Sequence, residues 1–318
     1  MMERLIVIVG PTAIGKTQIS IDLARHLHTE IISGDSMLVY RGLNIGTAKP
    51  TLEEQQGVTH HLIDIRDPHE EYSVVDFQKQ AGEFITKINQ KGFIPILAGG
   101  TGLYVRALLE GYQFNTTAAD EKLRKHFTDL ADIHGSNYLH NLLYTLCPEK
   151  AAKLHPHDRR RIIRALEVFH TEGQGTSEEA ACSSGEVCYD ALVIGLTMNR
   201  SDLYSRINQR VDMMLAAGLV AEVDQLTQLG LTSDHQSMQG IGYKEVLQHL
   251  RGDMDQTEMS ERIKQVTRNF AKRQQTWYRK MPYIQWINRD DYSDHNSLME
   301  HIYILVAGKF PDTVELSI

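Results

Sequence analysis

The chain has 318 residues, of which 42% are hydrophobic and 23% charged, which is typical of a soluble protein with one large or two modest domains. It has no run of about 18 apolar residues that would predict a membrane span, and its start leaves no room for a signal peptide. The net charge of -8 argues against a polyanionic partner, unless a local cluster of cations overrides the total. Cys147, Cys182 and Cys188 lack the spacing of a metal site, so we expect reduced thiols in the cytoplasm.

A phosphate-binding motif stands near the beginning of the chain. Residues 10–17 match the pattern G-x-x-x-x-G-K-[ST] at every fixed position. The apolar run 5–9 before the motif predicts a buried parallel strand, and residues 18–28 after it have the apolar spacing of an amphipathic helix. Backbone N–H groups at such a helix start bind anions. The sequence therefore predicts a site for a di- or triphosphate, and a chance match in a loop is the alternative.

Each part of this motif has an expected role. Lys16 adds a positive charge, and the Thr17 hydroxyl can ligate Mg²⁺. The predicted phosphate-binding residues are Gly10, Pro11, Thr12, Ala13, Ile14, Gly15, Lys16 and Thr17.

A carboxylate follows the second predicted strand, which covers residues 30–33 and runs into Gly34 and Asp35. Ligands of open α/β sheets bind at the carboxyl ends of the strands, so Asp35 lies where a reactive carboxylate is expected. Position alone leaves an equal alternative, in which Asp35 caps the following turn.

The next segments predict further strands and helices of the same layered fold. Glycine-rich residues 42–50 predict a surface loop, and residues 60–65 a short strand whose paired histidines we interpret as structural. Residues 73–91 have the pattern of a helix capped by Ser73 and ended by Gly92.

A glycine-rich turn ends the next predicted core strand, which covers residues 93–98. Residues 99–102 read Gly-Gly-Thr-Gly, and a helix is predicted over 103–109. An ordinary phosphate-loop NTPase ends such a strand with an aspartate that holds magnesium, so its absence argues against NTP hydrolysis. The glycines indicate that something flat or bulky approaches the backbone there.

The pattern changes from residue 115, where charge-rich helical segments replace the long β-branched runs, and strand character returns at 191–196. We therefore predict an α/β core formed by residues 1–114 and 189–318, with an inserted helical domain over 115–188. Residues 158–164 hold four arginines, and residues 262–280 hold seven Lys or Arg and no acidic residue. Both tracts suit a polyanion, although a solvated helix face is the ordinary alternative.

Together these motifs resemble the tRNA dimethylallyltransferase family, also called isopentenyl-tRNA transferase. The resemblance covers nearly the whole chain, and one departure is Leu38, where many members have glutamine. It is carried by residues 10–17, 35–36, 40–42, 45–50, 62–64, 72–73, 99–104, 164–168, 240–243 and 268–277. It implies a P-loop NTPase-like parallel sheet core flanked by helices, with an inserted all-helical domain.

The resemblance also implies a reaction. A dimethylallyl group passes from dimethylallyl pyrophosphate to the exocyclic amine (N6) of the adenosine 3′ of the tRNA anticodon, and pyrophosphate leaves. This explains a phosphate loop without an NTP. By resemblance Asp35 is the general base, Thr101 contacts the target nucleotide, and Arg210 reaches the pyrophosphate, as Arg106 also would.

The partners follow from the same resemblance. They are the anticodon stem-loop of tRNA, dimethylallyl pyrophosphate and Mg²⁺ at Thr17, and we expect a cytoplasmic monomer without a membrane partner. The implied tRNA-binding residues are Asp35, Ser36, Met37, Leu38, Thr101, Arg124, Arg160, Arg161, Ile162, Ile163, Arg164, Gly240, Ile241, Gly242 and Tyr243. Two rival interpretations are a small-molecule or nucleotide kinase, and a non-catalytic RNA-binding protein regulated by a nucleotide at the loop.

Overall fold

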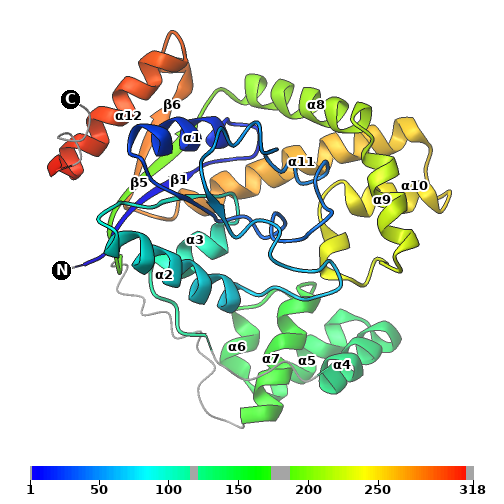
Figure 1. The fold of residues 1–318 in the computed structure, drawn as a ribbon. Helices are drawn as coiled ribbons and strands as arrows, with labels where there is room; N and C mark the ends of the chain where they lie inside the picture. Colours follow the sequence, from blue (N-terminus) through cyan, green and yellow to red (C-terminus); the bar gives the residue numbers. More distant parts are fainter. Residues whose placement is uncertain (1, 115–120, 173–186, 313–318) are drawn as a thin grey trace. The chain divides into compact units, whose positions relative to one another are not determined.

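The computed structural model of the chain describes residues 2–114, 121–172 and 187–312 (Figure 1). Cys182 and the first residues of the predicted insertion lie outside this part. The chain divides into two compact units. The first comprises Met1–Leu109 and Val187–Ile318, and the second comprises Glu110–Glu186.

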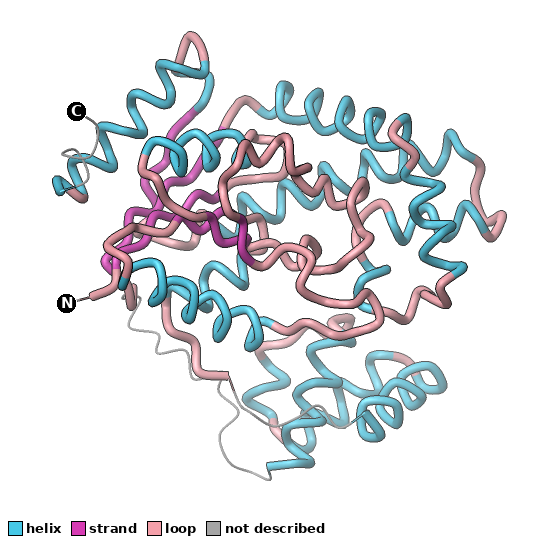
Figure 2. Tube along the Cα trace, in the orientation of Figure 1, coloured by secondary structure: helices cyan, strands magenta, loops and turns pink. Residues whose placement is uncertain are grey.

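A six-stranded parallel sheet forms the centre of the first unit, and Figure 2 shows its strands in magenta. The strand order is β3-β2-β4-β1-β5-β6. Central β1 pairs through Ile6 with Ile96 on one side and with Leu192 on the other. The strands are β1 Arg4–Val9, β2 Ile31–Ser33, β3 His60–His61, β4 Ile96–Ala98, β5 Asp190–Thr197 and β6 Ile284–Asn288.

Alternating side chains of β1 enter two different hydrophobic clusters, because successive residues of a strand point to opposite faces. Leu5 and Val7 join the cluster of α2 (Val74–Gln90) and α3 (Gly102–Leu109). Ile6 and Ile8 join the cluster of α1 (Lys16–His26) and α12 (His295–Lys309). Helices therefore cover both faces, which confirms the predicted P-loop NTPase-like core.

Two strands are shorter than predicted, and local backbone geometry explains why. The strand expected over 60–65 is only β3, because Leu62 and Asp64 take positive φ angles of 64° and 54° and leave the extended region. The strand expected over 93–98 begins at Ile96, directly after Pro95, which has no N–H to donate to a ladder.

Two further features lie in the C-terminal half. Residues 200–228 form two helices, α8 (Arg200–Ala216) and α9 (Leu219–Gln228), which are separate because Gly218 takes a left-handed φ of 100°. Strand β6 was not predicted. Its only fully buried positions are Ile284 and Ile287, so it lacks both alternation and a continuous apolar run.

The remaining helices complete the first unit. They are α10 (Tyr243–Leu250) and α11 (Gln256–Tyr278), with short 3₁₀ turns η1 (Gln236–Gln239) and η2 (Arg289–Asp291). Ser73 caps α2 as predicted, since its side chain accepts a hydrogen bond from the Asp76 N–H. Across the described ranges, no helix has both the length and the apolar character needed to cross a membrane.

The second unit has its own hydrophobic core. Its described helices are α4 (Glu121–His134), α5 (Ser136–Leu146), α6 (Pro148–Ala152) and α7 (Arg159–Glu172). Their inner faces meet in a cluster that includes Phe127, Leu139, Leu143, Ile162 and Leu166. This core leaves the arginines of α7 outside it.

Candidate active site

The phosphate loop connects β1 to α1, and its glycines permit its shape. Gly15 has a φ of 96° and stands directly before the first residue of α1. The Lys16 ammonium turns back into the loop and donates to the carbonyls of Gly10 and Pro11, at 2.9 Å each. The pKa of Lys16 is lowered to about 8, first by burial and then by the charge of neighbouring Arg210, while Asp35 opposes the shift.

Three arginines gather around this loop. Arg206 and Arg210 stand one turn apart on α8 and line a groove together with Gly15 and Thr17. Arg289, from η2, donates to the Ile14 carbonyl and lies directly against the Cα of Gly15. Burial lowers the pKa of Arg289, and the charge of Arg206 contributes to that shift. So many cations in one place favour an anionic ligand.

A cavity of about 130 Å³ lies beside the loop. Its polar lining includes Lys16, Thr17, Asp35 and Arg210. Burial lowers the pKa of Arg210, and Asp35 is the main charge that counteracts this shift. The cavity therefore combines two partly buried cations with one carboxylate.

A second cavity of about 330 Å³ shares Thr12, Asp35, Thr47 and Arg210 with the first. The two cavities therefore meet at the carboxylate and the guanidinium. The further lining of the larger cavity includes Ser36, Met37, Thr101, Gly240, Ile241, Gly242 and Tyr243, together with apolar Ile207, Val211 and Phe270. Most residues that the sequence assigned to tRNA in this unit thus line one cavity.

Asp35 has a structural contact as well as a place at this junction. Its Oδ1 accepts a hydrogen bond of 2.8 Å from the Met37 N–H, so it caps the turn after β2. Within the described part of the chain, Oδ2 accepts no hydrogen bond. The capping contact and a chemical role are therefore compatible, because they use different oxygens.

The other predicted residues are placed less uniformly. The Thr101 hydroxyl accepts from the Ser36 N–H at 3.0 Å and so holds the turn that carries Asp35. Leu38 lines the smaller cavity, whereas the other residues assigned to tRNA in this unit line the larger one. Arg106 lies partly buried on α3 and does not line either cavity.

The close approach expected at the glycine turn comes from the protein itself. A Cβ on Gly99 would collide with the backbone of Gly34, and one on Gly100 would meet the amide of Gln274. Gln274, on α11, also accepts from the Thr12 N–H at 2.9 Å and donates to the Gly100 carbonyl at 2.8 Å. It ties the phosphate loop to the glycine turn, and its only sequence signal was its place in the 268–277 motif.

In the second unit, a buried carboxylate holds one arginine of the basic tract and one of α4. Glu167 is 1% exposed and accepts from Arg124 Nε at 2.8 Å and from Arg164 Nη1 at 3.3 Å. Arg124, Arg160 and Arg164 line a groove of about 580 Å³. The predicted partners Ile162 and Ile163 are buried in the core, and Arg161 is exposed.

A phosphate loop surrounded by cations, on a sheet of this order, defines an enzyme of the phosphate-loop class that acts on a phosphorylated substrate. The sequence profile of the IPP transferase family matches residues 38–281. The chain therefore belongs to the IPP transferase family, and it is a transferase that modifies tRNA.

Relatives and solved structures support this membership over nearly the full length. The chain is 46% identical to the tRNA dimethylallyltransferase of Geobacillus kaustophilus, over 97% of this chain and 98% of the relative. The full-length tRNA isopentenylpyrophosphate transferase of Bacillus halodurans superimposes with a TM-score of 0.74 at 43% identity, covering 99% of both chains. A eukaryotic dimethylallyltransferase acting on tRNA gives a TM-score of 0.80 at 32% identity, over 96% of this chain and 79% of that one.

Proposed function

We propose that the smaller cavity holds the pyrophosphate end of dimethylallyl pyrophosphate and that the larger one receives the adenosine of the tRNA. The chain transfers the dimethylallyl group to the N6 amine of the adenosine 3′ of the anticodon and releases pyrophosphate. The observation that carries the assignment of sites is that both cavities meet at Asp35 and Arg210. Donor and acceptor would then react at the one place where both are accessible.

The residues at this junction suit the bond changes. The bond between C1 of the dimethylallyl group and the pyrophosphate oxygen breaks, and a bond between C1 and N6 forms. The adenine amine is a weak nucleophile, so a carboxylate that takes its proton as the new bond forms assists the step. Asp35 is the base in this proposal, and Arg210 stabilises the charge that develops on the leaving group.

The phosphate loop would bind the leaving group before and after bond breaking. Lys16 now donates to two loop carbonyls, and a bound pyrophosphate would offer its ammonium charged acceptors instead. Thr17 fits Mg²⁺, because this ion accepts one or two protein oxygens and completes its shell with phosphate oxygens and water. When bound, the ion would neutralise charge on the pyrophosphate.

The arginine groove of the second unit would bind the phosphates of the anticodon stem-loop. Glu167 holds Arg124 and Arg164 by their side chains while both remain more than 40% exposed, so their guanidinium groups stay accessible to RNA. Exposed Arg160 and Arg161 add two further cations on α7. We propose a monomer acting in the cytoplasm, where its tRNA substrate is found.

Incubation of the purified chain with labelled dimethylallyl pyrophosphate, Mg²⁺ and total tRNA tests the function directly. Nucleoside analysis should show label on N6 of the adenosine 3′ of the anticodon. ATP turnover without a prenyl donor would instead support a kinase. Tight RNA binding with no modified nucleoside would support a non-catalytic RNA-binding protein.

A further inference from the structure

The loop of residues 43–50 forms a wall of both cavities. Thr47 lines both of them, and Ala48 and Pro50 line the smaller one beside Lys16. This loop was predicted as an ordinary surface loop, yet Leu43 is fully buried. Whatever fixes this loop therefore fixes the shape of the proposed donor and acceptor sites.

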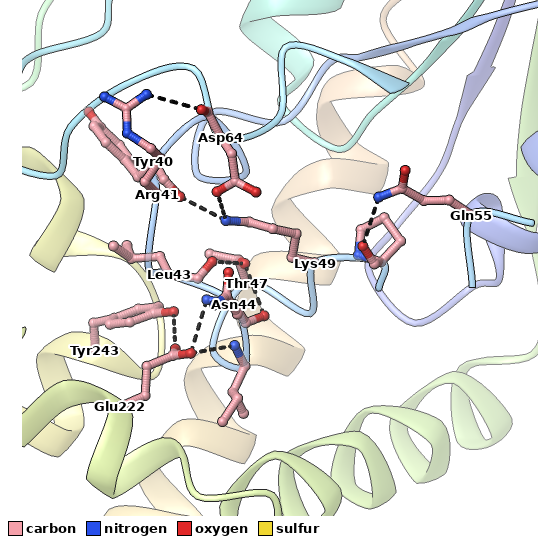
Figure 3. A network of polar contacts seen from close by, with 12 residues as sticks. Tyr40, Arg41, Leu43, Asn44, Thr47, Lys49, Gln55, Asp64, Glu222 and Tyr243 are labelled. Carbon is pink, nitrogen blue, oxygen red and sulfur yellow. Dashed lines mark hydrogen bonds and ion pairs between the residues drawn. The ribbon is translucent and has the colours of Figure 1, made fainter. Parts of the chain in front are cut away.

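A single carboxylate binds the backbone of this loop. Glu222, on α9, accepts at Oε2 from the N–H groups of Asn44 and Ile45, at 3.0 and 2.8 Å (Figure 3). Its Oε1 accepts from the Gly46 N–H at 3.2 Å. Three successive amides thus converge on one charged side chain, an arrangement otherwise used by proteins to bind anions. Hydrogen bonds to a charged acceptor are about twice as strong as neutral ones.

Tyr243 completes the arrangement from α10. Its hydroxyl donates to Glu222 Oε1 at 2.6 Å, and the side chain is only 1% exposed. Burial and then the charge of Glu222 raise the pKa of Tyr243, so it remains a neutral donor. Its ring lies against Gly46 so closely that a Cβ at that position would collide with it. Glycine at 46 is therefore needed for the contact between the loop and the tyrosine.

The far end of the loop is held separately. Lys49 donates to the Tyr40 carbonyl at 2.8 Å and pairs with Asp64, as Figure 3 shows. The Thr47 hydroxyl donates to the Leu43 carbonyl at 2.7 Å. These contacts fix the end and the internal turn of the loop. Residues 44–46 are held to α9 by the hydrogen bonds to Glu222, and Tyr243 of α10 supports them through its bond to Glu222 and its contact with Gly46.

We propose that Glu222 is a positioning residue for the transfer reaction, acting through residues 44–47 with Tyr243 as its support. Glu222 lines neither of the two cavities, so the residue acts on their wall and not on the substrates. Without the carboxylate the three amides lose their common acceptor, and the turn that carries Thr47 at the junction of the cavities loses these bonds to α9. This inference rests on the donor site proposed above.

The test compares Glu222→Gln with the wild type and with Asp224→Asn, which removes a charge from the same helix without touching the loop. Glutamine leaves one acceptor oxygen and points an NH₂ group at backbone donors. We expect kcat/KM for dimethylallyl pyrophosphate to fall on the order of tenfold to a hundredfold, because small misplacements of reacting groups cost about that much. Both a higher KM and a lower kcat should contribute, with tRNA affinity unchanged.

Tyr243→Phe keeps the ring and removes one hydrogen bond, so it should change the same parameters in the same direction by a few-fold. If Glu222→Gln does not fold, the kinetics of Tyr243→Phe test the inference. Rates are normalised to folded enzyme, so a purely structural role would lower the melting temperature and leave KM at the wild-type value. That result, or wild-type kinetics in Tyr243→Phe, would overturn the inference. A wild-type enzyme unable to use the donor would instead overturn the proposed function.

Discussion

The two units present their cations in different ways. In the first unit, Lys16 and Arg210 are partly buried beside Asp35, and desolvation lowers the pKa of both. In the second unit, Arg124 and Arg164 are partly exposed and paired with the carboxylate of Glu167. A desolvated cation acts strongly on one bound anion, whereas an exposed cation contributes modestly and is screened by salt. The first arrangement suits stabilisation of a leaving group, and the second suits binding along an RNA backbone.

The largest effect should come from Asp35→Asn, which keeps the side-chain shape and the acceptor for the Met37 N–H but cannot accept the amine proton. A positioned base contributes about a hundredfold to ten-thousandfold in rate. Single-turnover transfer should fall by that order, with affinities for tRNA and dimethylallyl pyrophosphate near the wild type.

A purely capping role predicts instead that Asp35→Asn keeps both its rate and its stability, whereas Asp35→Ala loses the cap and up to about 2 kcal/mol of stability in thermal unfolding. Asp224→Asn is the matched control and should keep the wild-type rate. A well-folded Asp35→Asn enzyme that transfers at the wild-type rate would exclude the base assignment.

Lys16→Ala should come next, because it removes a desolvated cation from the phosphate loop. Loss of one preorganised donor to a developing charge typically costs about a hundredfold to a thousandfold in kcat. Transfer rate and tRNA affinity are measured separately, with exposed Lys79→Ala as the control. An unchanged rate, or an equal collapse of tRNA affinity, would contradict the contrast between the two units.

The pH dependence of kcat/KM should show a smaller effect of Lys16 than its replacement by alanine does. The pKa of Lys16 is lowered to about 8, so in the free enzyme the ammonium loses its proton as pH rises through 8. We expect kcat/KM for the donor to fall toward tenfold per pH unit above that value, and Lys16→Ala to lack this limb. Because folding lowers the pKa of Lys16 from 10.5 to about 8, the charged side chain decreases the free energy of unfolding at pH values below about 8. This penalty disappears as the pH rises from 8 to 10.5, where the folded state has lost the proton and the unfolded state still holds it. Binding of tRNA to the arginines should show no such limb.

The smallest change in chemistry should come from Arg160→Ala combined with Arg164→Ala. Each lost phosphate contact should lower the slope of log affinity against log salt by about 1, while transfer at saturating tRNA stays near the wild type. Titrations at several salt concentrations measure the slope, with exposed Arg25→Ala as the control. An unchanged slope would mean that these arginines form a solvated helix face.

The sequence by itself determined the phosphate loop, the parallel core and the position of Asp35. These features are encoded locally, in eight consecutive residues between a strand and a helix, and in a carboxylate at the end of the next strand. Local signals also placed the four arginines of residues 158–164 on one helix. The pattern left open which carboxylates hold them: Arg159 pairs with Asp132, and Arg164 pairs with the buried Glu167.

Only the tertiary structure decided which distant side chains complete the site. Gln274 and Arg289 reach the phosphate loop across 262 and 275 residues, and Glu222 reaches Ile45 across 177. A lone glutamine, arginine or glutamate on a helix or turn has no periodic or motif signal that reveals such a contact. Likewise the loop of residues 43–50 has the composition of a surface loop, and its burial depends on packing against α9 and α10. Hydrogen bonds between remote segments are set by the packing of the whole fold, and local sequence patterns do not record them.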